Sequence, residues 1–128
     1  MMQLNIQNET SRLKAVILGI ANSNGPVPSI EEAYDPKSIE FIKKGAYPKE
    51  IDMIEEMEQV AAVLRKYNVD VFRPKKIENY NQIFARDIGF VIEDKFIRAN
   101  ILPDREQEIE AIHYVINQMN PENVIVLP

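Results

Sequence analysis

The stretch FARDIGFVIEDKFIRA, at residues 84–99, decides the fold class because it predicts two strands joined by a charged turn. Its two apolar runs flank the charged residues 93–95, as in a β-hairpin. Asp87 stands directly before the first run. Because Asp is disfavoured inside strands, we expect its carboxylate at the mouth of the sheet. Gly89 lies within the run, which predicts a bulge or the close approach of another group.

Helices and strands are predicted to alternate on both sides of this hairpin. Before it we expect a strand at 13–20 buried on both faces, a loop at 21–34, a helix from Pro36 to Lys44 capped by Asp35, an amphipathic helix that begins at Pro48 and stops at Asn68, and a strand at 69–72. After it we expect a helix that follows an Asp104 cap and ends at Asn120, and a strand at 123–127. This alternation predicts an α/β fold in one domain over residues 1–128, with parallel strands wherever a helix connects them.

The composition limits the partners of the chain. Its formal net charge is -5 and its pI is about 4.9, which argues against nucleic acid or an anionic membrane as the main partner. There is no cysteine, so disulfides, thiolate metal sites and cysteine nucleophiles are excluded within these residues. No apolar run approaches the roughly 20 residues that span a bilayer, and the polar residues 1–10 lack a signal-peptide pattern. We therefore expect a cytoplasmic protein that uses no metal and no other cofactor.

Most charged side chains are expected to have structural roles. His113 is predicted to be a packed or half-exposed helix histidine, because no second histidine or cysteine could share a metal with it. Asp87 could be a strand-start residue that pairs with Arg86 or Arg98. Two acidic clusters are predicted to be solvated helix faces: Glu55, Glu56 and Glu58, and Glu106, Glu108 and Glu110.

Three segments resemble one enzyme family in their order and spacing. Residues 83–92 and 95–99 place an Arg-Asp pair at the start of an apolar strand, followed by a tight turn and a second strand. Upstream, the helix at 54–64 leads into a valine-rich strand that ends in Arg-Pro at 69–74, and 13–19 provides a first strand. Together they resemble the amidinotransferase branch of the guanidino-group modifying enzymes, the pentein superfamily, which includes glycine amidinotransferase. The resemblance spans nearly the whole chain.

The resemblance implies a five-bladed α/β propeller of ββαβ modules around a central channel, of which this chain would supply about two. It also implies a small guanidino substrate, such as arginine or a derivative, with Asp87 bound to the guanidinium group. A planar cation with paired N–H donors suits a bidentate carboxylate. In the family a cysteine attacks the central guanidinium carbon, a histidine moves the protons, and an amine or water completes the reaction as a transferase or a hydrolase.

The chain departs from the family pattern because it contains no cysteine. His113 does not match the catalytic histidine, since it lies on the helix of an early module. The resemblance therefore carries over Asp87 as a substrate-binding residue, with Asn22 and Asn24 of the 21–26 loop as candidates for lining the channel. We expect an N-terminal fragment, inactive alone, whose partners are the remaining modules of its own chain or further copies of itself.

Two other interpretations remain open. The chain could be a non-catalytic α/β binding or assembly module that oligomerises through its open sheet edges, because unpaired strand edges invite partners. It could also be a generic α/β ligand binder in which Asp87 has no special role.

Overall fold

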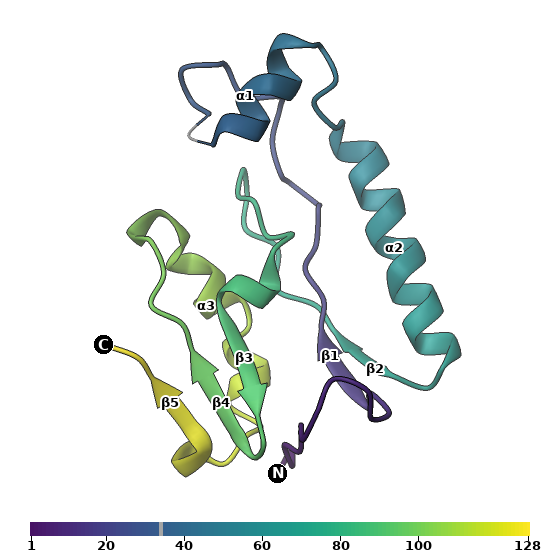
Figure 1. Cartoon of the computed structure of the whole chain (residues 1–128), viewed down its shortest axis with the longest axis vertical. Coiled ribbons are helices and arrows are strands. Elements are labelled where there is room, and N and C mark those ends of the chain that lie inside the picture. Colours follow the sequence, from purple (N-terminus) through teal and green to yellow (C-terminus); the bar gives the residue numbers. More distant parts are fainter. Residues whose placement is uncertain (34) are drawn as a thin grey trace.

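The computed structural model describes residues 1–33 and 35–128 and shows a mixed α/β fold with two small sheets (Figure 1). β1 (Ala15–Ile17) and β2 (Asp70–Phe72) form a parallel pair, and β3 (Gly89–Ile92), β4 (Lys95–Arg98) and β5 (Val124–Val126) form the second sheet. In that sheet β4 is central, antiparallel to β3 and parallel to β5. The predicted hairpin, and the predicted parallel pairing of strands connected by helices, are confirmed.

The two helices between β1 and β2 begin and end largely as their local sequence predicts. The Asp35 carboxylate caps α1 (Pro36–Lys43) by accepting a hydrogen bond from the Ser38 backbone N–H at 2.8 Å. Interactions with the Ser38 side chain and, second, with its backbone N–H lower the pKa of Asp35. Gly45 follows α1 with a φ of 67°. Beyond α2 (Glu50–Lys66), Asn68 adopts a φ of 60°, the left-handed conformation typical of a helix end. Tyr34, the last residue of the predicted loop, lies outside the described residues.

The prediction that the first strand is buried on both faces is wrong. β1 spans only Ala15–Ile17, with Ala15 exposed and Val16 and Ile17 half-buried. Within the described residues β1 is three residues long and pairs only with β2, so its other edge has no strand partner and the strand stays partly accessible to solvent. α2 lies along this pair and contributes the fully buried Ala61 (Figure 1).

The predicted long helix over 105–119 is also wrong, because this segment forms three short pieces. They are the 3₁₀ turn η2 (Pro103–Arg105), α3 (Gln107–Ala111) and α4 (His113–Ile116). Asp104 makes no capping bond to η2 or α3. The break between α3 and α4 occurs at Ile112, whose φ of -108° and ψ of 4° depart from helical values and whose N–H bonds to the Ile109 carbonyl three residues back.

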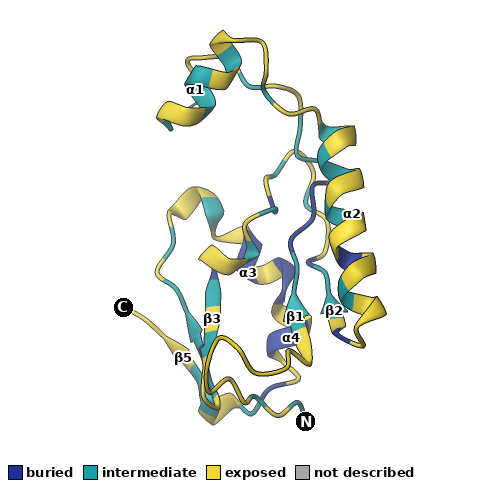
Figure 2. Ribbon diagram, turned by 45° about the vertical axis from the view of Figure 1, so that its right-hand side comes forward, coloured by how far each residue is buried: buried dark blue, intermediate teal, exposed yellow. Residues whose placement is uncertain are grey.

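The main hydrophobic core lies between α3, α4 and one face of the β3–β4–β5 sheet. Figure 2 shows the buried positions gathered on α3 and α4 next to this sheet. A Cβ added to Gly89 would lie 2.4 Å from Cζ of Phe96, so the close approach predicted at this glycine is confirmed. The buried members of the core are Ile88, Phe96, Ile109, Ile112, Val115, Ile116 and Met119.

Hydrogen bonds of Arg73 hold the ends of β1 and β2 together and link this pair to α4. The Arg73 guanidinium donates to the carbonyls of Leu18 and Gly19 at 3.2 and 3.0 Å. The Tyr114 hydroxyl donates to the Arg73 carbonyl at 2.7 Å, and this bond links α4 to the end of β2. No helix within residues 1–33 or 35–128 combines the length and apolar character needed to cross a bilayer.

Candidate functional site

Asp87 lies on a 3₁₀ turn that delivers the chain into β3. This turn, η1 (Ala85–Asp87), is closed by a hydrogen bond from the Asp87 N–H to the Phe84 carbonyl at 3.0 Å, and β3 begins two residues later at Gly89. The next residue, Ile88, is buried in the core and anchors the turn. The Asp87 side chain is 42% exposed. The carboxylate is therefore presented to solvent on a backbone that the core holds in place.

The closest ion pair of Asp87 is with Arg105, a residue that the sequence did not single out. Nη1 of Arg105 lies 3.1 Å from Oδ2 of Asp87, and Nη2 of Arg105 donates to the Phe84 carbonyl at 3.4 Å. The other carboxylate oxygen, Oδ1, lies 3.6 Å from Nε of Arg86, whose side chain is 91% exposed. The alternative pairing with Arg86 is thus present only as a long, exposed contact, which contributes little.

Glu108 completes this cluster, and its predicted place on a solvated helix face is wrong. Only 2% of Glu108 is exposed. Its two carboxylate oxygens accept hydrogen bonds from Nε and Nη2 of Arg105 at 2.5 and 3.1 Å, the bidentate arrangement that guanidinium and carboxylate groups favour. The hydrogen bonds with Glu108 raise the pKa of Arg105. Glu108 and Glu110 are two residues apart on α3 and lie on opposite sides of the helix, so Glu108 is buried whereas Glu110 remains exposed. Arg105 and Glu108 are three residues apart, a spacing at which helical side chains are neighbours, so the sequence alone could have predicted this ion pair.

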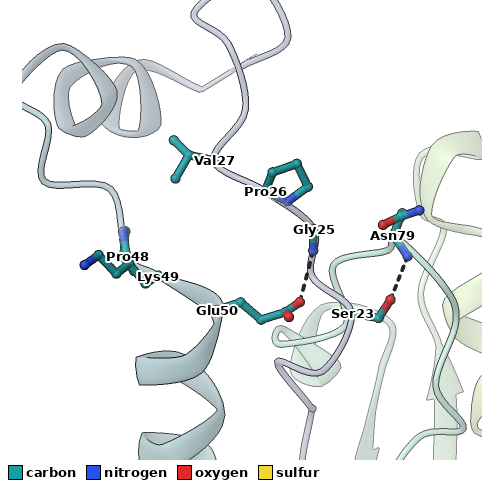
Figure 3. A pocket seen from close by; sticks show the side chains of 8 residues that line it. All are labelled: Ser23, Gly25, Pro26, Val27, Pro48, Lys49, Glu50 and Asn79. Atoms are coloured by element: carbon teal, nitrogen blue, oxygen red, sulfur yellow. Dashed lines mark hydrogen bonds between the residues drawn. The ribbon is translucent and has the colours of Figure 1, made fainter.

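The 21–26 loop borders a separate open pocket of about 460 Å³. The Ser23 hydroxyl donates to the Glu78 carboxylate at 2.7 Å. It also accepts from the Asn79 N–H at 2.9 Å, and the Gly25 N–H donates to the Glu50 carboxylate at 3.2 Å (Figure 3). The pocket is lined by Ser23, Gly25, Pro26, Val27, Pro48, Lys49, Glu50 and Asn79. Neither Asp87 nor Asn22 is among these residues.

The two asparagines proposed for the channel lie on this loop but do not line the pocket. Asn22 is half-buried. Oδ1 of Asn24 is buried and has no hydrogen-bond partner within residues 1–33 and 35–128. Within the described residues, neither this pocket nor a hydrogen bond brings either asparagine together with Asp87.

His113 occupies a solvent-facing position on α4. Its side chain is 55% exposed, and its Nδ1 lies 4.0 Å from a carboxylate oxygen of Glu110. The prediction of a half-exposed helix histidine is confirmed. In the described part of the chain, no three His, Cys, Asp or Glu side chains are grouped so that they could hold a metal ion.

Comparison with known proteins shows a similarity in fold. No family model matches the sequence, and no curated protein matches it. Among solved structures, SxtG, an amidinotransferase of the saxitoxin biosynthetic pathway from Microseira wollei, is 20% identical with a TM-score of 0.64 over 97% of this chain. The inosamine-phosphate amidinotransferase StrB1 from Streptomyces griseus is 19% identical with a TM-score of 0.66 over 99% of this chain.

The chain spans less than half the length of both of these structures, 41% of the first and 44% of the second. Nearly all of it nevertheless superposes on a part of each. The chain therefore has the fold of a portion of an amidinotransferase, and the resemblance seen in the sequence is confirmed at the level of fold.

Proposed function

We propose that this chain forms the guanidinium-binding part of an amidinotransferase-like enzyme, in which Asp87 binds a small guanidino substrate such as arginine or a derivative. The observation that carries the proposal is the fold, which matches two amidinotransferases over 97% and 99% of the chain. The Asp87 carboxylate, 42% exposed at the entrance to β3, supplies the chemistry that a planar cation requires.

The Asp87 carboxylate has hydrogen-bonding capacity left for a ligand. Arg105 bonds to Oδ2, and within the described residues Oδ1 accepts no hydrogen bond. A carboxylate has about four lone-pair directions, so one arginine does not saturate it. The long contact with Arg86 involves a highly exposed side chain, which can move aside at little energetic cost. A substrate guanidinium can thus donate to Oδ1 while Arg105 stays in place.

The nucleophile of the proposed reaction would come from outside these residues, since none of the 128 is a cysteine. In the reaction that the resemblance implies, a sulfur–carbon bond to the guanidinium carbon forms and the carbon–nitrogen bond to the donor amine breaks. The departing amine takes up a proton, and an amine or water then receives the amidino group. The part assigned to this chain is to bind and orient the guanidinium.

Asp87→Ala is expected to lower the affinity for arginine by at least about tenfold, because the charge-assisted bonds to the carboxylate are lost. Isothermal titration calorimetry of the wild-type chain and the variant measures this change. Asp94→Ala is the matched control, since Asp94 is also a half-exposed carboxylate paired with a basic side chain, Lys95 at 3.1 Å. Equal binding by the wild type and Asp87→Ala would contradict the role of Asp87.

A second candidate function, self-assembly, is favoured by the exposed apolar face of the β3–β4–β5 sheet. The register places Phe90, Ile97 and Ile125 side by side across the three strands, on the face opposite Phe96. Phe90 is 46% exposed and Ile125 is 40% exposed. A sheet with apolar residues on both faces is normally covered on both. In this interpretation the chain is a non-catalytic module that binds further copies of itself.

The assembly interpretation predicts concentration-dependent dimers or larger species of the purified chain, measured by light scattering or sedimentation velocity. Ile125→Glu is expected to shift the population to monomer, because a charge would be buried in the contact. Val27→Glu is the control, since Val27 is 50% exposed but lies on a loop away from the sheet. A wild-type chain that stays monomeric at all concentrations would remove the support for this function.

A further inference from the structure

The Arg105 guanidinium clamps the turn that carries Asp87. Two of its nitrogens, Nε and Nη2, bond to Glu108 at 2.5 and 3.1 Å, while Nη1 bonds to Oδ2 of Asp87 at 3.1 Å. Nη2 also donates to the Phe84 carbonyl, so the same planar group holds both the backbone and the side chain of η1. A guanidinium fixed on one edge by a bidentate carboxylate has little freedom left to rotate. Arg105 thereby holds the Asp87 carboxylate through its Oδ2 atom.

The charge of the cluster depends on Glu108. Asp87 and Arg105 alone form a neutral pair, which would attract a cation only weakly. The two carboxylates and the single guanidinium carry one net negative charge together. Because Glu108 is only 2% exposed, water screens its charge much less than it screens the 91% exposed Arg86 beside the same carboxylate. The buried carboxylate therefore restores the negative potential that Arg105 would otherwise cancel.

From this geometry we infer that Arg105 and Glu108 are positioning residues for guanidinium recognition. Arg105 holds Oδ2 and, within the described residues, leaves Oδ1 without a hydrogen-bond donor, and Glu108 anchors Arg105 while keeping the site anionic. Neither residue has to touch the ligand. The inference rests on the proposed role of Asp87 and extends it to two residues that act through Asp87.

The two residues should have different effects on ligand selectivity. Glu108→Gln removes the charge but keeps the shape, so the affinities for methylguanidinium and methylammonium should fall together, by about tenfold. Arg105→Lys keeps the charge but loses the planar clamp, so the preference for methylguanidinium over methylammonium should disappear. A loss of stability alone would lower the folded fraction without changing the ratio of the two affinities.

The experiment is an NMR titration of the isotope-labelled chain with methylguanidinium and, separately, methylammonium. The amides of Ile88 and Gly89, next to Asp87, report binding, and the amide spectrum shows whether each variant is folded. The variants are Asp87→Asn, Arg105→Lys and Glu108→Gln. Glu110→Gln is the control, because Glu110 lies on the same helix with a side chain that is 77% exposed; it should bind as the wild type does.

The outcomes separate the inference from the function on which it rests. If Asp87→Asn loses binding while Arg105→Lys and Glu108→Gln keep wild-type affinity and selectivity, the inference is wrong and the role of Asp87 stands. If the wild type does not bind, or Asp87→Asn binds as the wild type does, the proposed function fails and the inference fails with it. Should Arg105→Lys not fold, the affinities of Glu108→Gln decide the matter alone.

Discussion

Replacement of Arg105 by methionine is expected to lower the free energy of unfolding by about 3–5 kcal/mol. The reason is that Glu108, only 2% exposed, would keep a buried charge without a partner. The Arg105 side chain is itself only 24% exposed, so solvent does little to weaken this pair. Urea denaturation followed by circular dichroism measures the change. Lys37→Met is the control, since the pair of Lys37 with Glu40 is exposed and is expected to contribute less than about 1 kcal/mol.

A double variant tests whether the buried charge is the cause. Arg105→Met combined with Glu108→Leu removes both charges and should recover most of the lost stability, because a buried ion pair can often be replaced by apolar side chains at little cost. If the single variant cost no more than Lys37→Met, Glu108 would have to be hydrated in solution. If the double variant were as unstable as the single one, the loss would come from packing rather than from the unpaired charge.

Gly19→Ala is expected to destabilise the chain by about 3 kcal/mol, at the upper end of the usual cost of overpacking. A Cβ at this position would lie 2.1 Å from the Ile83 carbonyl oxygen and 2.4 Å from that of Gln82. These atoms belong to the backbone and cannot rotate away. Gln82 is 2% exposed, and its side-chain amide donates to the Lys75 carbonyl at 2.7 Å, which holds the segment in place. Thermal unfolding measures the loss.

The site of the damage can be located by hydrogen exchange. The Ile20 N–H donates to the Gln82 carbonyl at 3.0 Å, and Gly19→Ala should break this bond and speed the exchange of the Ile20 amide. Gly45→Ala is the matched control. Its loss of stability should come only from the left-handed backbone at a φ of 67°, since nothing lies within 4 Å of its added Cβ. A Gly19 variant no less stable than the Gly45 variant, with slow exchange at Ile20, would show that the close approach is absent.

The ends of α1, the stop of α2 at Asn68 and the hairpin were predictable because each depends on a few neighbouring residues. Asp35 followed by Pro36 begins α1 through a bond to a backbone N–H three residues away. The charged residues after β3 form its turn, with Glu93 at a φ of 52°. The prediction of one helix over 105–119 was wrong, because apolar residues recur at the same spacing in one regular helix and in a series of short helical pieces. The break at the buried Ile112 depends on how that side chain packs in the core.

The sequence by itself determined the alternation of helices and strands, the strand that follows Asp87 and the resemblance in fold, because these depend on local periodicity and on the order of segments along the chain. The tertiary structure alone decided what surrounds Asp87. Arg105 lies 18 residues further along and reaches Oδ2 because η2, which carries it, lies beside η1 in the folded chain. Glu108 is likewise buried rather than solvated in the folded chain. The sequence shows which residues are charged. Which of these side chains are buried, and which ion pairs they form, depends on elements that come together only in the folded chain.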